Sequence, residues 1–280
     1  MGNALKSVVA FFPSSWCQRY LLGDGVDELP PDKTMDLSGK HLRTFPLQVC
    51  AFTELVKLYL SNNNLRSLPP ELHLLGCLQV LALDFNRFKE LPQAVCRLRQ
   101  LSALYLGNND LSDLPAELSS LTELKTLWME GNCFEQIPRV VSELKHLRVL
   151  HAGCNQLTEL PRELWRLGEL QNIWLAGNSF SEFPKVLLQI DSLEIIDVDR
   201  NSIRTFPSLE RMKHLKLVIY DRNPCKSGPR VGEEVRRVGK WADYRPEAAA
   251  GLQEEAREEL EGNEDVETTG VSEDPASVRE

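Results

Sequence analysis

Long apolar runs are missing from this sequence. No stretch approaches the roughly 18 apolar residues that a membrane-spanning helix needs, so we expect no transmembrane segment. Residues 7–12 form a short apolar stretch, but it is shorter than the apolar part of a secretion signal. Because no small-x-small cleavage site follows it, we expect no signal peptide either.

Paired cysteines are missing as well. The seven cysteines lie singly along the chain, and none belongs to a Cys-x-x-Cys pair. Their number is odd, and the sequence has no Asn-x-Ser/Thr glycosylation acceptor. These features favour free thiols in a reducing compartment over a secreted, disulfide-linked fold.

Catalytic and cofactor motifs are also absent. The sequence lacks the phosphate-binding loop, the dinucleotide glycine motif, the His-Glu-x-x-His zinc motif and the Gly-x-Ser-x-Gly nucleophile turn. His151 and Cys154 are close in sequence, but a hydrolase using His151 would need a third group and a cleft that excludes water. The other histidines show no metal-ligand spacing. We therefore predict a protein that is not an enzyme and binds no cofactor or metal.

The negative charge is concentrated at one end. Residues 246–280 carry twelve acidic residues and two arginines, a net charge of −10, whereas the whole chain carries −9. The rest of the chain is therefore nearly neutral and provides no general electrostatic reason to bind nucleic acid. Because residues 246–280 are acidic and poor in aromatic residues, we expect a disordered, solubilising tail.

A 23-residue period dominates the rest of the sequence. The segments LALDFNRFKELP, LYLGNNDLSDLP and LWMEGNCFEQIP follow one another at this interval, and the first begins at Leu81. The recurring asparagines are Asn63, Asn86, Asn109, Asn132, Asn155, Asn178 and Asn201, followed by Asn223. The recurring prolines run from Pro46 to Pro207. This is the leucine-rich repeat pattern.

Each fixed position of the repeat has a structural role. The two apolar residues of Leu-x-Leu point into the core, and the residue between them points the other way, because side chains alternate along a strand. The asparagine amide can pair backbone groups of the turn that would otherwise be buried unpaired. The pattern predicts an α/β solenoid, a leucine-rich repeat horseshoe of about eight to nine repeats with a parallel concave sheet and short 3₁₀ or helical convex segments.

The ends of such a stack need caps, because a single repeat cannot bury both of its faces. We predict an N-terminal cap over residues 1–33, the repeat array over 34–225, a C-terminal cap over 226–245 and the acidic tail over 246–280. In the N-terminal cap, the residues expected to cover the first repeat are Trp16, Tyr20, Leu21 and Leu22. Val231, Val235 and Val238 recur at helical spacing with Trp241, which predicts a capping helix at about 230–243.

The residues between the two apolar positions vary from repeat to repeat. In order they are Tyr59, Ala82, Tyr105, Trp128, His151, Trp174, Asp197 and Ile219. Neighbouring strands lie about 4.8 Å apart, so the rings should form a nearly continuous strip on the concave sheet. In the next outward column, small residues should leave the rings accessible, and four acidic residues should border the strip: Asp84, Glu130, Asp199 and Asp221.

Two interpretations of the strip differ in what they predict. Rings on adjacent strands can simply pack together, which contributes roughly 0.2–1 kcal/mol per pair. A concave solenoid face has no second layer, however, and a row of exposed rings typically marks an interaction site with Trp and Tyr as anchors. We therefore predict a protein-binding surface, and we expect Trp128→Ala with Trp174→Ala to abolish partner capture while the thermal transition stays nearly intact. Its residues are Tyr59, Tyr105, Trp128, His151, Trp174, Asp84, Glu130 and Asp199.

Two further features have simpler explanations. Gly2 begins a segment like the myristoylation signal, but Lys6 stands where that signal has Ser or Thr, so we expect no acylation. Basic residues cluster near the predicted capping helix, where a localisation signal or a second docking patch is the alternative to solvated charge. The cluster is sparse, and we interpret it as solvated charge.

Several segments resemble a heart-enriched family of vertebrate leucine-rich repeat proteins. They are MGN, HLRTFPLQVC, ELVKLYLS, LALDFN, LYLGNN, HAGCN, IDVDRNSIRTFPSL, LKLVIYDRNPC and VRRVGKWA, and they extend to about residue 243 without the acidic tail. The resemblance implies a non-enzymatic adaptor of cardiac muscle that binds actin and α-actinin. Independently of it, we expect a monomer. The resemblance also implies a place in the cytoplasm at the sarcomeric Z-disc and in the nucleus, and a role in heart development and contraction.

A second functional class stays open. Repeats of this length also resemble intracellular signalling scaffolds that bind a small GTPase or a phosphatase. Capture from muscle lysate would separate the two classes, because it would yield actin and α-actinin in one case and a nucleotide-dependent GTPase in the other.

Overall fold

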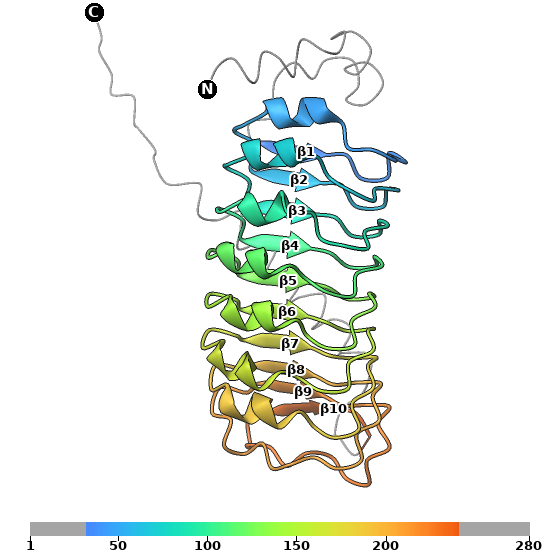
Figure 1. Cartoon of the computed structure of the whole chain (residues 1–280). Coiled ribbons are helices and arrows are strands. Elements are labelled where there is room, and N and C mark those ends of the chain that lie inside the picture. Colours follow the sequence, from blue (N-terminus) through green and yellow to red (C-terminus); the bar gives the residue numbers. More distant parts are fainter. Residues whose placement is uncertain (1–31, 241–280) are drawn as a thin grey trace, which may run out of the picture.

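A computed structural model describes residues 32–240 and shows one parallel sheet whose ten strands follow in chain order (Figure 1). The strands are β1 (Thr34–Asp36), β2 (Lys57–Tyr59), β3 (Val80–Ala82), β4 (Ala103–Tyr105), β5 (Thr126–Trp128), β6 (Val149–His151), β7 (Asn172–Trp174), β8 (Ile195–Asp197), β9 (Leu217–Ile219) and β10 (Arg236–Val238). Each is three residues long and pairs in parallel with the next.

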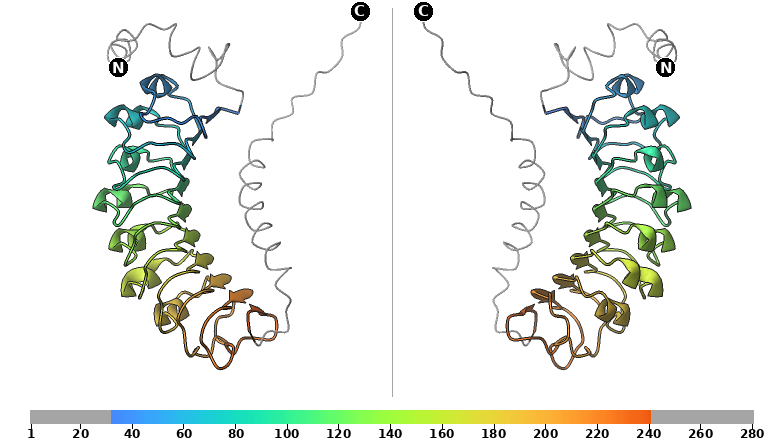
Figure 2. Two further views of the ribbon diagram at one scale, coloured as in Figure 1. Left: turned by 90° about the vertical axis from the view of Figure 1, so that its right-hand side faces the viewer. Right: turned by 90° about the vertical axis from the view of Figure 1, so that its left-hand side faces the viewer.

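Short 3₁₀ segments lie opposite the sheet. They are η2 (Leu47–Ala51), η3 (Pro70–Leu74), η4 (Val95–Arg97), η5 (Ala116–Ser120), η6 (Arg139–Glu143), η7 (Arg162–Arg166) and η8 (Lys185–Gln189). The solenoid curves with the strands on its inner side and these segments on its outer side (Figure 2). The predicted fold class is therefore confirmed, including the 3₁₀ character of the convex segments. Within residues 32–240, no helix has the length and apolar character needed to cross a bilayer.

The core consists of the fixed apolar positions of the repeats. In each Leu-x-Leu the two outer residues are fully buried, as Leu58 and Leu60 illustrate. Two residues after each asparagine the buried side chain alternates in size, for example Phe88, Leu111 and Phe134. Burying each such side chain contributes about 1.5–3 kcal/mol relative to exposure, and a single unit cannot bury it without its neighbours.

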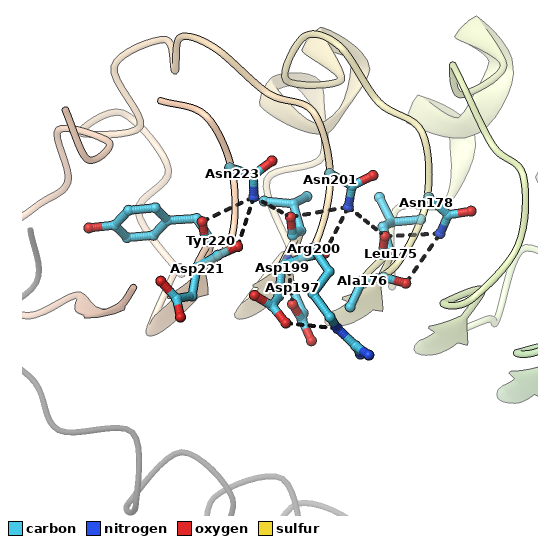
Figure 3. Close-up of polar contacts among 11 residues, drawn as sticks. Leu175, Ala176, Asn178, Asp197, Asp199, Arg200, Asn201, Tyr220, Asp221 and Asn223 are labelled. Atoms are coloured by element: carbon cyan, nitrogen blue, oxygen red, sulfur yellow. Dashed lines mark hydrogen bonds and ion pairs between the residues drawn. The ribbon is translucent and has the colours of Figure 1, made fainter. Parts of the chain in front are cut away.

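The predicted pairing of the asparagine amides with backbone groups of the turns is confirmed, and the stacked amides form a ladder along the solenoid. The side-chain nitrogen of Asn132 donates to the carbonyl oxygens of Leu106, Met129 and Glu130 at 2.9, 3.2 and 3.1 Å. Its side-chain oxygen accepts from the Leu111 backbone N–H at 3.0 Å. The amide groups of Asn178, Asn201 and Asn223 lie in one row in Figure 3. Each amide joins two consecutive repeats, so the ladder holds the strands in register.

The predicted C-terminal capping helix is wrong over residues 230–240. This part of the chain turns at Gly232–Val235 and then adds β10, which pairs with β9. The Arg236 N–H donates to the Lys216 carbonyl at 2.8 Å, and the Tyr220 N–H donates to the Val238 carbonyl at 2.9 Å. The backbone groups at the edge of β9 need hydrogen-bond partners. An additional strand supplies them, whereas a helix could not.

Other predictions lie outside the described residues. The N-terminal cap over residues 1–33, with Trp16 and its neighbours, falls almost wholly before residue 32, and the acidic tail begins after residue 240. Within residues 32–240 the six cysteines are free thiols.

Candidate protein-binding face

The four ring-bearing residues from β4 to β7 lie in register across consecutive strands. Tyr105 is paired with Trp128, Trp128 with His151, and His151 with Trp174. The ring centroids of these pairs are 5.7, 4.7 and 5.5 Å apart, in edge-to-face, tilted and stacked arrangements respectively. The structure therefore brings these four predicted residues together as one row of contacting rings, which we call the aromatic strip.

The strip is shorter than the predicted one. Tyr59 is separated from Tyr105 by one strand, because Ala82 occupies the intervening position on β3. Tyr59 and Asp84 therefore lie at the N-terminal end of the concave face, beyond the contacting rings. The strip itself begins at Tyr105.

The exposure of the rings also differs from the expectation. Tyr105, Trp128 and His151 are half-buried, whereas Trp174 is only 6% exposed. One face of the Trp174 ring is stacked on His151, and β8 places Asp197 in register on its other side. The expectation of an accessible ring is therefore wrong for Trp174, which is part of the packed structure.

The acidic border is held by specific contacts. Glu130 lies beside the strip, with its Oε2 atom 3.5 Å from Nε2 of His151, an ion pair when the imidazole is protonated. Asp84 accepts a hydrogen bond from the Gly107 backbone N–H at 2.7 Å. Asp199 pairs with Arg200, whose Nε is 3.0 Å from the Asp199 carboxylate. Among the acidic residues of the predicted site, Glu130 therefore has an ion-pair contact with a ring of the aromatic strip.

Sequence reasoning placed Asp197 in the strip's column but did not include it in the site. Asp197 is 3% exposed, and burial raises the pKa of its carboxyl to about 7. The Asp199 N–H, which donates to it at 2.9 Å, lowers the pKa, while the carboxylates of Asp199 and Glu130 raise it. Figure 3 shows Asp197, Asp199 and Arg200 grouped beside the asparagine ladder. In the sequence, the position of Asp197 next to the ring-bearing residues could have marked it as part of the site. Its burial could not have been predicted, because burial depends on packing.

The local chemistry disfavours a nucleophile. Burial raises the pKa of the Cys154 thiol, and the nearby Glu130 carboxylate raises it further, so the thiol is protonated at neutral pH. Cys154 also has a positive φ of 50° in the turn before Asn155. Among residues 32–240, no three histidine, cysteine or acidic side chains are grouped as metal ligands would be. What the face offers is flat aromatic surface bordered by carboxylates, an arrangement suited to binding a polypeptide.

Solved structures share this architecture. A leucine-rich repeat protein of Leptospira interrogans superposes with a TM-score of 0.68 at 26% identity, over 74% of this chain and 59% of that chain. The plant peptide hormone receptor RGFR1, solved in complex with RGF2, superposes with a TM-score of 0.53 at 26% identity, over 66% of this chain and 35% of that chain.

Comparison of the sequence with families and curated proteins is more specific. Residues 36–157 match the family model of a leucine-rich repeat region. Leucine-rich repeat-containing protein 10 of Mus musculus is 74% identical over 247 residues, which are 88% of this chain and 90% of the mouse protein. At this identity and coverage, the chain belongs to the leucine-rich repeat-containing protein 10 family.

Proposed function

We propose that this protein is a non-enzymatic adaptor that holds a protein partner on its concave face. The observation that carries the proposal is the aromatic strip from Tyr105 to Trp174, with Glu130 at its border. Trp and Tyr are the residues that most often anchor protein interfaces. Membership in a leucine-rich repeat family supports a protein-binding role in general.

The chemistry of the face favours a partner segment with both apolar and cationic side chains. Aromatic rings provide apolar contact area and attract cations through their π faces, and neighbouring carboxylates add charge attraction. The similarity to a plant peptide hormone receptor supports the use of this architecture for binding a polypeptide.

For the identity of the partner, the proposal relies on the resemblance to the heart-enriched repeat proteins. It points to actin and α-actinin in cardiac muscle, and to a role in heart development and contraction. The corresponding location is the cytoplasm, at the sarcomeric Z-disc, and the nucleus. The alternative is a signalling scaffold that binds a small GTPase or phosphatase through the same face.

The test uses purified partners and matched tryptophan variants. Tyr105→Ala with Trp128→Ala removes two half-buried rings of the strip but leaves Trp174 in place. Trp165→Ala is the control, because Trp165 is 53% exposed on the outer segment η7. We expect the double variant to lose about tenfold or more in affinity for actin filaments or α-actinin, and the control to bind as the wild type does.

Three results would contradict the proposal, each in a different part: the binding face, the class of partner or the place where the partner binds. Equal loss in the control would show that the strip is not the binding face. Capture of a GTPase only in one nucleotide state would favour the scaffold alternative. Unchanged binding by a folded double variant would place the partner elsewhere on the protein.

A further inference from the structure

The loops that follow the first three strands carry a column of cations. Arg43, Arg66 and Lys89 stand at equivalent positions of consecutive repeats, and all three are exposed. Across residues 32–240 none of them forms an ion pair. Like charges stacked at repeat spacing repel each other, so a bound anion would relieve the repulsion.

Arg87 lies in the same loop as Lys89, two residues before it, and adds a further cation beside this column. With the Asn64 amide turned so that its oxygen faces Arg87, that oxygen accepts hydrogen bonds from Arg87 Nη2 at 2.9 Å and Nε at 3.3 Å. A shallow hollow of about 670 Å³ lies here, lined by Arg66, Asn86, Arg87, Lys89, Glu90 and Asp110. Arg66, Arg87 and Lys89 therefore line a concave part of the surface.

Phe85 lies in the same loop, at a position of the repeat where the backbone φ is positive from Gly39 through to Arg222. It is 59% exposed and has a φ of 53°, a left-handed conformation that is unfavourable for a bulky residue. The neighbouring repeats have Asn62, Asn108 and Gly131 at this position, which are residue types that adopt positive φ more readily. Later repeats have Cys154, Arg200 and Arg222 there, so Phe85 differs from the others in combining positive φ with a large apolar side chain. Phe85 therefore combines an unfavourable backbone conformation with exposed apolar surface, and neither feature stabilises the folded chain.

We propose that Arg43, Arg66, Phe85, Arg87 and Lys89, the N-terminal edge surface, form a second docking site for an acidic protein segment that carries an apolar side chain. The cations would pair with the carboxylates of the segment, and its apolar side chain would pack on Phe85. The surface lies at the C-terminal ends of the strands in the first repeats, on the right-hand side of Figure 1. The inference is independent of the proposed function, because none of its residues belongs to the aromatic strip.

An acidic protein segment fits this surface better than nucleic acid does. Glu90 and Asp110 line the same hollow as the cations and would repel a continuous row of phosphates. A polypeptide can place uncharged residues opposite these two carboxylates. The exposed Phe85 in the loop that carries Arg87 and Lys89 also favours a partner with apolar side chains.

The experiment measures binding of a short fluorescent peptide of glutamates with one central leucine to the full chain by anisotropy. Arg66→Glu with Lys89→Glu should weaken binding about tenfold or more. Phe85→Asn retains a residue suited to positive φ and should remove the advantage of the leucine peptide over an all-glutamate peptide. The charge-matched control is Arg139→Glu with Arg162→Glu, two exposed cations of η6 and η7. It should bind as the wild type does.

Other outcomes overturn the proposal. Equal weakening by the control pair would show attraction to net charge rather than to this surface. Tight binding of a single-stranded RNA with no binding of the peptide would assign the surface to nucleic acid. If removal of residues 246–280 raises peptide affinity about tenfold and the removed segment, added as a peptide, competes, the occupant is the acidic tail of this chain instead of a partner. Normal binding by the Tyr105→Ala, Trp128→Ala variant would support the independence of the two sites.

Discussion

The rings of His151 and Trp174 stack on each other, with centroids 5.5 Å apart and an angle of 16° between their planes. This contact joins a half-buried side chain of the concave face to one that is almost fully buried. His151 also lies next to Glu130, so the same stack connects the packed part of the strip to its charged border. Substitutions in the strip should therefore affect stability and binding to different degrees, depending on the ring removed.

Trp174→Ala should destabilise the protein by about 3 kcal/mol, because it removes a buried ring and the stacking partner of His151. Urea denaturation followed by circular dichroism measures this change. Trp165→Ala, which removes an exposed ring, should change the free energy of unfolding by less than about 0.5 kcal/mol. We therefore no longer expect the Trp128→Ala, Trp174→Ala variant to keep its thermal transition, because the loss of Trp174 alone should lower stability. Equal stability of the two single variants would contradict the packed role of Trp174.

Asn132→Ala should destabilise the protein by about 3 kcal/mol. The substitution leaves the buried Leu111 N–H without its acceptor and removes the amide that bridges three carbonyl groups. The comparison is Asn64→Ala, since the Asn64 amide contacts only the exposed Arg87 side chain. Chemical denaturation of both variants should give a loss of less than about 1 kcal/mol for the second. Similar losses would mean that the ladder contributes no more than a surface contact.

Asp197→Asn should stabilise the protein at neutral and higher pH but not at acidic pH. Burial raises the pKa of Asp197 from 3.8 to about 7, so its ionisation favours the unfolded state. The wild type therefore loses stability as the pH rises from about 4 to about 7 and loses no more above that range. The gain from the variant should follow the same curve and reach at most about 4 kcal/mol.

Thermal denaturation between pH 4 and pH 9 measures this gain. An asparagine side chain can still accept the hydrogen bond from the Asp199 N–H, so the variant removes the charge and keeps this contact. Asp191→Asn, which removes the same charge at an exposed position, is the control. If the gain in stability from Asp197→Asn does not change with pH, ionisation of Asp197 costs the folded state little free energy, and the prediction is wrong.

Phe85→Asn should stabilise the folded protein by about 1 kcal/mol, because asparagine adopts positive φ at a lower cost than phenylalanine. Phe85→Ala loses the same exposed ring but keeps a residue unsuited to this conformation, so the difference between the two variants isolates the backbone term. Differential scanning calorimetry of both proteins would measure it. A less stable asparagine variant would show that the phenylalanine ring contributes packing in the folded state.

Much of the architecture is predictable because the constraint repeats. A buried asparagine and flanking leucines at a 23-residue interval permit one in-register way of stacking, so the parallel sheet, the amide ladder and the column containing Trp128 follow from spacing alone. The positions of Tyr105, Trp128, His151 and Trp174 on one face were predictable for the same reason.

The end of the stack was not predictable in this way. Val231 and Val235 have helical spacing, but the exposed edge of β9 needs backbone partners, and β10 supplies them. The spacing of apolar residues reports only on neighbours along the chain. The need for backbone hydrogen-bond partners arises at β9, about twenty positions before β10 in the sequence.

By itself, the sequence determined the repeat and the alternation of side chains along each strand, and therefore the list of residues on the concave face. Only the tertiary structure decided which of them are accessible: Trp174 and Asp197 are buried, while Trp128 is half-buried. It also decided that Phe85 has a positive φ and yet stays exposed. Alternation along a strand is a property of each chain segment, but burial and pKa depend on what neighbouring strands bring alongside, which no single repeat encodes.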